Sequence, residues 1–135
     1  MNGYRTMLDT NIVSDLIRNP SGRAAARLRQ HGEAGICASI ITAAELRYGA
    51  AKKQSARLMR RVEAVLSTID VLPFEVPADA EYGKIRADLE AAGQPIGPTD
   101  LFIAAHACSM GVTLITHNVG EFGRVRGLKV EDWLD

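Results

Sequence analysis

Short apolar runs alternate along this chain with longer segments of helical pattern, and this alternation limits the fold more than any other feature. The runs that predict strands lie at 4–8, 35–38, 70–72, 112–115 and 128–130. The helical patterns lie at 10–18, 22–30 (with Ser21 as cap), 39 or 42 to 51, 54–66, 78–92 and 98–110. Short apolar strands separated by helices indicate a parallel sheet that is covered on both faces. The sequence therefore predicts an α/β protein, in one domain spanning 1–135.

Four acidic residues stand in apolar sequence with no equally placed Lys or Arg beside them. They are Asp9, Glu45, Asp100 and Glu121. Burying a carboxylate without a partner costs several kcal/mol, so a metal cation is the expected partner. Hard ions such as Mg²⁺ take oxygen ligands, a few from protein and the rest from water and phosphate. Two of the acids follow predicted strands, and the carboxyl edge of a parallel sheet is where ligands bind.

Each acid also has a local explanation. Asp9 could cap the helix that follows it, since Asp is a favoured N-cap. Glu45 completes a capping box with Thr42, unless Ser39 is the cap and Glu45 then lies inside the helix. Asp100 would gain only about 0.3–1 kcal/mol from the helix dipole, too little to offset burial. Glu121 follows a turn-like segment and is either a site residue or an exposed loop residue, with the Asn118 amide oxygen as the alternative ligand.

The balance of charge restricts how the chain could bind nucleic acid. Lys plus Arg and Asp plus Glu both number 16, so the net charge is zero, which argues against a general nucleic-acid coating protein. An enzyme with a local basic rim stays possible, and Arg124, Arg126 and Lys129 are the predicted RNA-phosphate contacts near the metal edge. A second basic cluster is either a solvated face or a phosphate- or partner-contacting rim; it comprises Lys52, Lys53, Arg57, Arg60 and Arg61.

The sequence gives no sign of a membrane or secretory segment. No apolar stretch reaches the roughly 18 residues that span a bilayer, and the first residues lack the apolar core of a signal peptide. A cytoplasmic location, with no membrane partner, is the resulting expectation.

Four motifs together carry a resemblance to a known family. They are Leu8-Asp9-Thr10-Asn11, then Thr42 to Gly49, Gly97 to Ala107, and Leu114 to Phe122 followed by Gly127-Leu128. The chain resembles the PIN-domain ribonucleases, most closely the VapC-type toxins of bacterial toxin–antitoxin pairs. This resemblance implies a three-layer α/β/α sandwich with a central, mainly parallel five-stranded sheet.

The resemblance also implies a site and an activity. Asp9, Glu45 and Asp100 would be the acidic triad of an Mg²⁺- or Mn²⁺-dependent endoribonuclease, completed by Asn118 or Glu121. Expected hydrogen-bonding neighbours of these ligands are Thr10, Asn11 and Thr116. The expected partners are an RNA substrate such as tRNA, a small antitoxin protein and a second copy of the chain in a homodimer.

Three other functions remain as alternatives. The chain could be a PIN-fold nuclease that processes RNA or cuts DNA without an antitoxin, or a catalytically silent binding module, although its three main acids are all present. Phosphatase chemistry on an aspartyl nucleophile is disfavoured, because Asn11 stands where a second Asp would be needed.

Overall fold

The fold is built on one five-stranded sheet. The structure, a computed structural model, describes residues 3–32 and 34–134. The strands are β1 (Thr6–Leu8), β2 (Ile36–Ser39), β3 (Asp70–Leu72), β4 (Thr113–Ile115) and β5 (Val130–Glu131). The helices are α1 (Thr10–Arg18), α2 (Arg23–His31), α3 (Ile40–Lys52), α4 (Ala56–Leu66), α5 (Ala78–Ala91), α6 (Pro98–Met110) and α7 (Val119–Phe122).

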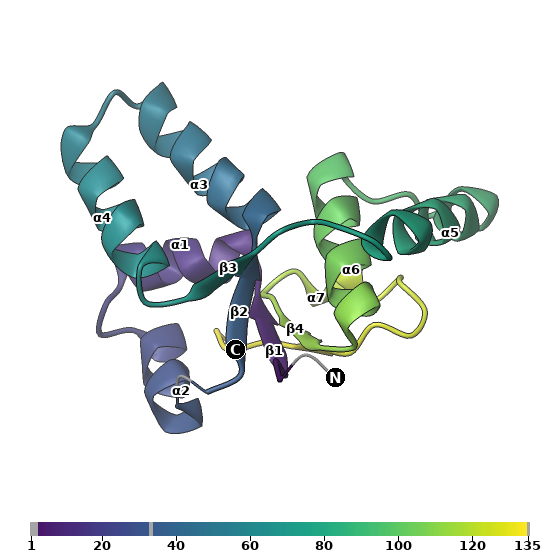
Figure 1. Ribbon diagram of the computed structural model, residues 1–135, viewed down its shortest axis with the longest axis horizontal. Helices are drawn as coiled ribbons and strands as arrows, with labels where there is room; N and C mark the ends of the chain where they lie inside the picture. The colour runs from purple at the N-terminus through teal and green to yellow at the C-terminus, as the bar shows by residue number, and fades with distance from the viewer. Residues whose placement is uncertain (1–2, 33, 135) are drawn as a thin grey trace.

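All neighbouring strands of the sheet run parallel, in the order β3-β2-β1-β4-β5. β1 lies in the middle, with Leu8 level with Ala38 of β2 and with Ile115 of β4. Helices cover both faces, so the predicted α/β/α sandwich is confirmed, with every pairing parallel (Figure 1). The residues that follow β1, β4 and β5 therefore meet at one edge of the sheet.

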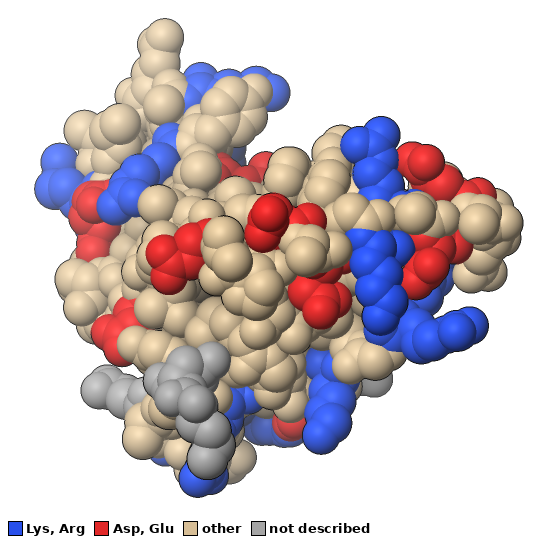
Figure 2. Space-filling model, turned by 45° about the vertical axis from the view of Figure 1, so that its right-hand side comes forward, with Lys and Arg blue, Asp and Glu red and all other residues tan. Residues whose placement is uncertain are grey.

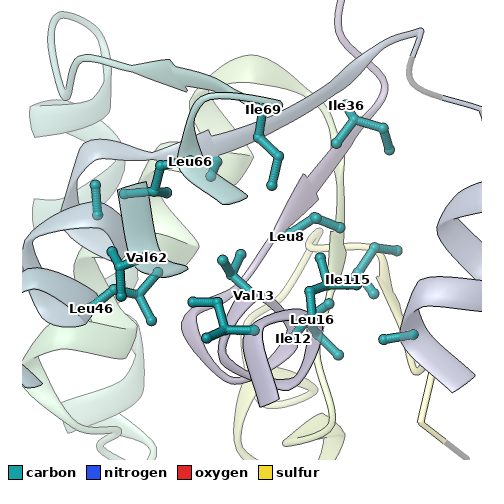
Figure 3. Packing of buried hydrophobic residues seen from close by; sticks show 14 of the residues in the cluster. Leu8, Ile12, Val13, Leu16, Ile36, Leu46, Val62, Leu66, Ile69 and Ile115 are labelled. Atoms are coloured by element: carbon teal, nitrogen blue, oxygen red, sulfur yellow. The ribbon is translucent and has the colours of Figure 1, made fainter. Parts of the chain in front are cut away.

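Alternate strand residues serve two separate cores, because side chains of a strand point to opposite faces in turn. Leu8, Ile36 and Ile115 join the core beneath α1, α2 and the α3–α4 pair, which Figure 3 shows from close by. Met7 and Leu114 point the other way, into the core formed with α5 and α6. Burial of β1, β2 and most of β4 on both faces explains why these strands are mostly apolar.

Helices α3 and α4 form an arm that projects from the sheet, on the other side of the molecule from α5 and α6 (Figure 1). Val62 and Leu66 of α4 pack inward toward the core. The Arg47 guanidinium donates two hydrogen bonds to Glu63 across the arm, at 3.0 and 2.9 Å. The two helices thus behave as one unit whose inner side belongs to the core.

Three predicted details were wrong. Helix α2 begins after Gly22, which offers no side chain as a cap, and not after Ser21. The last strand is Val130–Glu131 and not 128–130. The segment after Asn118, predicted as a turn, forms the short helix α7. In the described ranges, no helix has both the length and the apolarity to cross a membrane.

Candidate metal and catalytic site

Asp9 stands at the carboxyl end of the central strand and begins α1. It is 3% exposed, and its Oδ1 accepts a hydrogen bond from the Ile12 amide at 3.0 Å. Burial raises the pKa of Asp9, and the hydroxyl of Thr116 partly offsets this by donating a hydrogen bond. The N-cap role and a role in the site are therefore compatible: one carboxylate caps the helix at the edge of the sheet.

Asp100 is the residue around which the other three acids gather. It lies in the first turn of α6, and its pKa is raised to about 7. Burial is the largest cause, and the charge of Glu121 comes next, followed by weaker repulsion from Asp9 and Glu45. All four carboxylates singled out in the sequence thus face one another at the same edge. Acidic side chains occupy the middle of the face in Figure 2, with Lys and Arg on either side.

Glu121 is a fixed part of this edge and not a loop residue. Its Oε1 accepts from the Gly97 amide at 2.8 Å, and its Oε2 accepts from the Asn118 side-chain amide at 2.6 Å. The Gly97 amide is the main cause of the lowered pKa of Glu121. Protonated Asp100 can donate to Glu121, which links the two carboxylates. A Cβ on Gly97 would lie 3.7 Å from Glu121 Oε1, an ordinary van der Waals contact, so the backbone amide and not the missing side chain is what this residue contributes.

Glu45 is not used as a helix cap. Ser39 caps α3 by accepting from the Ile41 amide at 3.1 Å, which leaves Glu45 inside the helix and half-buried. Thr42, the cap residue of the other interpretation, is fully buried. Glu45 is therefore free to face Asp100, whose pKa it raises.

The three predicted neighbouring polar residues have different surroundings. Thr116 is fully buried, bonds Asp9, and accepts from the Asn118 amide at 2.9 Å. Thr10 donates to Thr42 at 3.3 Å, which ties α1 to α3. Asn11 is exposed, although its backbone amide donates to Asp9. Thr116 is thus the neighbour that most directly supports an acid.

Sequence reasoning missed a fifth carboxylate, Asp132. It follows β5 as Asp9 follows β1, and its charge contributes to the raised pKa of Asp9. Its Oδ2 lies 3.0 Å from Nδ1 of His117, and its Oδ1 accepts from the Leu134 amide at 2.8 Å. The position of Asp132 directly after a strand was the signal available in the sequence.

Of the three predicted RNA-contacting residues, Arg124 and Arg126 line one hollow and Lys129 lies apart from them. Arg124 is beside the acids: its charge lowers the pKa of Glu121, and it donates to the Pro95 carbonyl at 3.2 Å. Arg126 lines a hollow against α5 that also includes Lys84. Lys129 precedes β5, at the amino edge of the sheet, so its predicted place near the metal edge was wrong. The length of a three-residue strand, roughly 10 Å, separates the two edges.

The acidic side chains of this site suit an ion such as Mg²⁺, which keeps several waters, better than an ion that takes all of its ligands from the protein. Across residues 3–32 and 34–134, no three His, Cys, Asp or Glu side chains are close enough to hold an ion by themselves. Mg²⁺ usually takes only one or two carboxylates and keeps several waters, whereas structural Zn²⁺ sites need four protein ligands. Asp9 and Asp100, a buried and a half-buried carboxylate near two more acids, meet the first requirement.

Residues 6–128 match the PIN domain family. The chain belongs to the PIN-domain family. Among similar proteins, the tRNA(fMet)-specific endonuclease VapC of Shigella flexneri is 42% identical over 128 residues, which cover 94% of this chain and 96% of that protein. Ribonuclease VapC2 of Haemophilus influenzae is 40% identical over 129 residues, or 95% of this chain and 97% of the relative.

Solved structures place this PIN domain in the same group. The crystal structure of DNA-bound VapBC from Salmonella typhimurium contains a chain with a TM-score of 0.88 and 38% identity, covering 96% of this chain and 98% of that one. The predicted membership of the VapC-type PIN domains is thereby confirmed.

Proposed function

We propose that this PIN domain is an Mg²⁺- or Mn²⁺-dependent endoribonuclease and the toxin of a toxin–antitoxin pair. The observation that carries the proposal is the gathering of Asp9, Glu45 and Glu121 around the half-buried Asp100 at one edge of the sheet, which raises the pKa of Asp100 to about 7. Such a cluster is costly unless a cation neutralises it. The ribonuclease names of relatives with 40–42% identity support RNA as the substrate.

Each acid has a role that its contacts suit. Asp9 and Asp100 would hold the ion, directly or through water, while Glu45 would bind a second ion or orient the attacking water. Glu121 is held by the Gly97 amide and by Asn118, whose amide oxygen is a further candidate ligand. When bound, the ion lowers the pKa of a water and neutralises charge on the scissile phosphate. Water then attacks in line, with no covalent enzyme intermediate.

A basic rim on the arm would hold the substrate near these acids. Residues 40–66 carry six Lys and Arg against two acids, in a chain whose net charge is zero. Arg57, Arg60 and Arg61 of α4 are exposed, and within the described part of the chain none of them has an ion-pair partner. Together with Arg124, they offer only a few phosphate contacts, so affinity for RNA in general should be low and salt-dependent.

Substrate choice should therefore depend on RNA shape. Aromatic residues make up 5% of the chain, too few for a long base-stacking surface. We expect cuts at one or a few positions in a structured RNA, with a tRNA anticodon loop as the first candidate. Sequencing of RNA 5′ ends after brief induction measures this directly. Cuts spread evenly over messenger and ribosomal RNA, with tRNA intact, would refute it.

Asp9→Asn is the matched control for that experiment. Asparagine is as good an N-cap as aspartate, so the variant should keep the bond from Ile12 and remove only the charge. Expression of the wild type should halt growth, and Asp9→Asn should relieve the arrest and remove the cuts. Arrest by both proteins would show that toxicity does not come from this site.

The proposed partner is a small antitoxin, with the toxin itself a homodimer. Support comes from the similar solved structure, which is a VapBC complex. An Arg or Lys of the antitoxin would enter among Asp9, Glu45 and Asp100, where a guanidinium can bind carboxylates bidentately. This antitoxin side chain and the metal ion would compete for the same carboxylates. Raising the Mg²⁺ concentration about tenfold should therefore raise the antitoxin concentration needed for half inhibition. A value independent of Mg²⁺ would place the inhibitory contact elsewhere.

A further inference from the structure

His106 is a buried polar side chain that the proposed chemistry does not use. It lies on α6 among apolar neighbours and is 2% exposed. Its Nδ1 is 2.8 Å from the Oγ of Ser39, the residue that caps α3. The ring of Phe74 packs edge-on against it, with centroids 5.5 Å apart. His106 thus joins the middle of one helix to the start of another.

The hydrogen bonds around His106 determine which nitrogen carries the proton. The ring bonds the backbone of Pro73, where only a carbonyl is available and an N–H must donate. With Nδ1 at Ser39, this proton belongs to Nε2, so the Ser39 hydroxyl donates to Nδ1. Burial lowers the pKa of His106, which favours this neutral form. Since Ser39 Oγ also accepts from the Ile41 amide, the bonds run unbroken from Pro73 to the first turn of α3.

On both α3 and α6, the His106–Ser39 contact lies six residues from an acid of the proposed site. Glu45 lies six residues after Ser39 on α3, and Asp100 lies six residues before His106 on α6. Helix α3 leaves the sheet and α6 returns toward it, so the two run in opposite directions (Figure 1). Six residues span about 9 Å of helix. Glu45 and Asp100 therefore both lie about one and a half turns from this contact, beyond the sheet edge, and the charge of Glu45 contributes to the raised pKa of Asp100.

We propose that the His106–Ser39 hydrogen bond fixes the axial register between α3 and α6, and so sets the separation of Glu45 from Asp100. His106 is then a positioning residue for the proposed nuclease site, and this inference rests on the proposed function. A slip of one residue along a helix moves a side chain by about 1.5 Å. Misplacement of a catalytic group by about 1 Å can cost on the order of 100-fold in rate.

Two amide variants separate positioning from packing. In His106→Asn the amide oxygen and nitrogen are bonded to Cγ, as Nδ1 is in histidine. Asparagine can therefore keep the hydrogen bond to Ser39, but it is too short to keep the one to Pro73. In His106→Gln the amide reaches the place of Nε2, so Gln keeps Pro73 and loses Ser39. Each variant loses one buried hydrogen bond and should be less stable, while Ile17→Val, on the far part of α1, supplies a destabilised control with an intact site.

The readouts are kcat and KM for RNA cleavage, together with Mn²⁺ affinity by calorimetric titration without RNA. We expect His106→Gln to lose about 10- to 100-fold in kcat, with KM within about threefold and Mn²⁺ bound more weakly. His106→Asn and Ile17→Val should stay within about threefold of the wild type in kcat and in Mn²⁺ affinity. Equal losses in the Asn and Gln variants, or none in Gln, would overturn the inference.

A second variant covers the case in which His106→Gln does not fold. Ser39→Gly removes the same hydroxyl, yet glycine is tolerated at an N-cap at a cost of a few tenths of a kcal/mol. It should lose kcat and Mn²⁺ affinity as the Gln variant does, and wild-type values would overturn the register role. A folded wild type that neither binds Mn²⁺ nor cuts RNA would instead refute the proposed function itself.

Discussion

Asp100→Asn should abolish RNA cleavage, by at least about 100-fold, and leave the metal-free protein as stable as the wild type or more stable. The charge on Asp100 is opposed by burial and by Glu121, Asp9 and Glu45, and asparagine removes that repulsion. The same charge is what a metal ion would need, so activity and stability should move in opposite directions. A gain of about 1 kcal/mol would raise Tm by roughly 3–5 °C in a chain of this length.

Asp79 provides the matched control, because it is an exposed acid in the first turn of α5. Asp79→Asn loses a favourable interaction with the helix dipole and meets no opposing cluster, so it should lower Tm slightly and spare cleavage. If Asp100→Asn behaved in the same way, Asp100 would be an ordinary helix-start residue and the site would be misplaced.

The pH dependence of stability should report the same repulsion. The pKa of Asp100 is raised from 3.8 in an unfolded chain to about 7 in the fold, so the folded state binds the proton more tightly. Its contribution to stability is complete below pH 4 and is lost as pH rises through 7. Metal-free wild type should therefore lose more Tm between pH 5 and 8 than Asp100→Asn does.

Removal of metal should stop cleavage completely. With excess chelator the site keeps its carboxylates but loses the cation that activates water, so no cut RNA should accumulate. Adding back Mg²⁺ or Mn²⁺ beyond the chelator should restore the rate. Mn²⁺ should also raise Tm of the wild type, because a ligand that binds only the folded state stabilises it, and should do so less in Asp100→Asn.

A control separates metal dependence from damage to the protein. The circular dichroism spectrum of the protein in chelator should match the spectrum after the metal is added back. Such a match would show that the fold persists without the ion. Undiminished cleavage in chelator would exclude a metal-dependent reaction at this edge.

The acids were predictable because the topology of a parallel sheet places them. Asp9 follows a strand directly, and apolar sequence around Asp100 marks a buried helix start, so both could be placed without coordinates. The choice of cap at α3 could not be made from sequence, since Ser39 and Thr42 are both good caps. Only the hydrogen bond from Ile41 to Ser39 decides it and frees Glu45.

Local patterns failed where a feature was too short. Four residues of α7 give no helical period, so the sequence could not decide whether Glu121 was a site residue or an exposed loop residue, although two hydrogen bonds hold it. β5 has two residues, and an error of two residues at its start put Lys129 at the wrong edge. Asp132 was overlooked for the same reason, because the end of that strand was not located.

The order of the strands has a consequence for the cell that makes this protein. β1 is synthesised first and pairs with both β2 and the much later β4. Asp9 meets Asp100 only after about ninety further residues have been added, and Glu121 follows later still. A chain that ends before Asp100 thus lacks half of the acidic edge, which is complete only once Glu121 has been added.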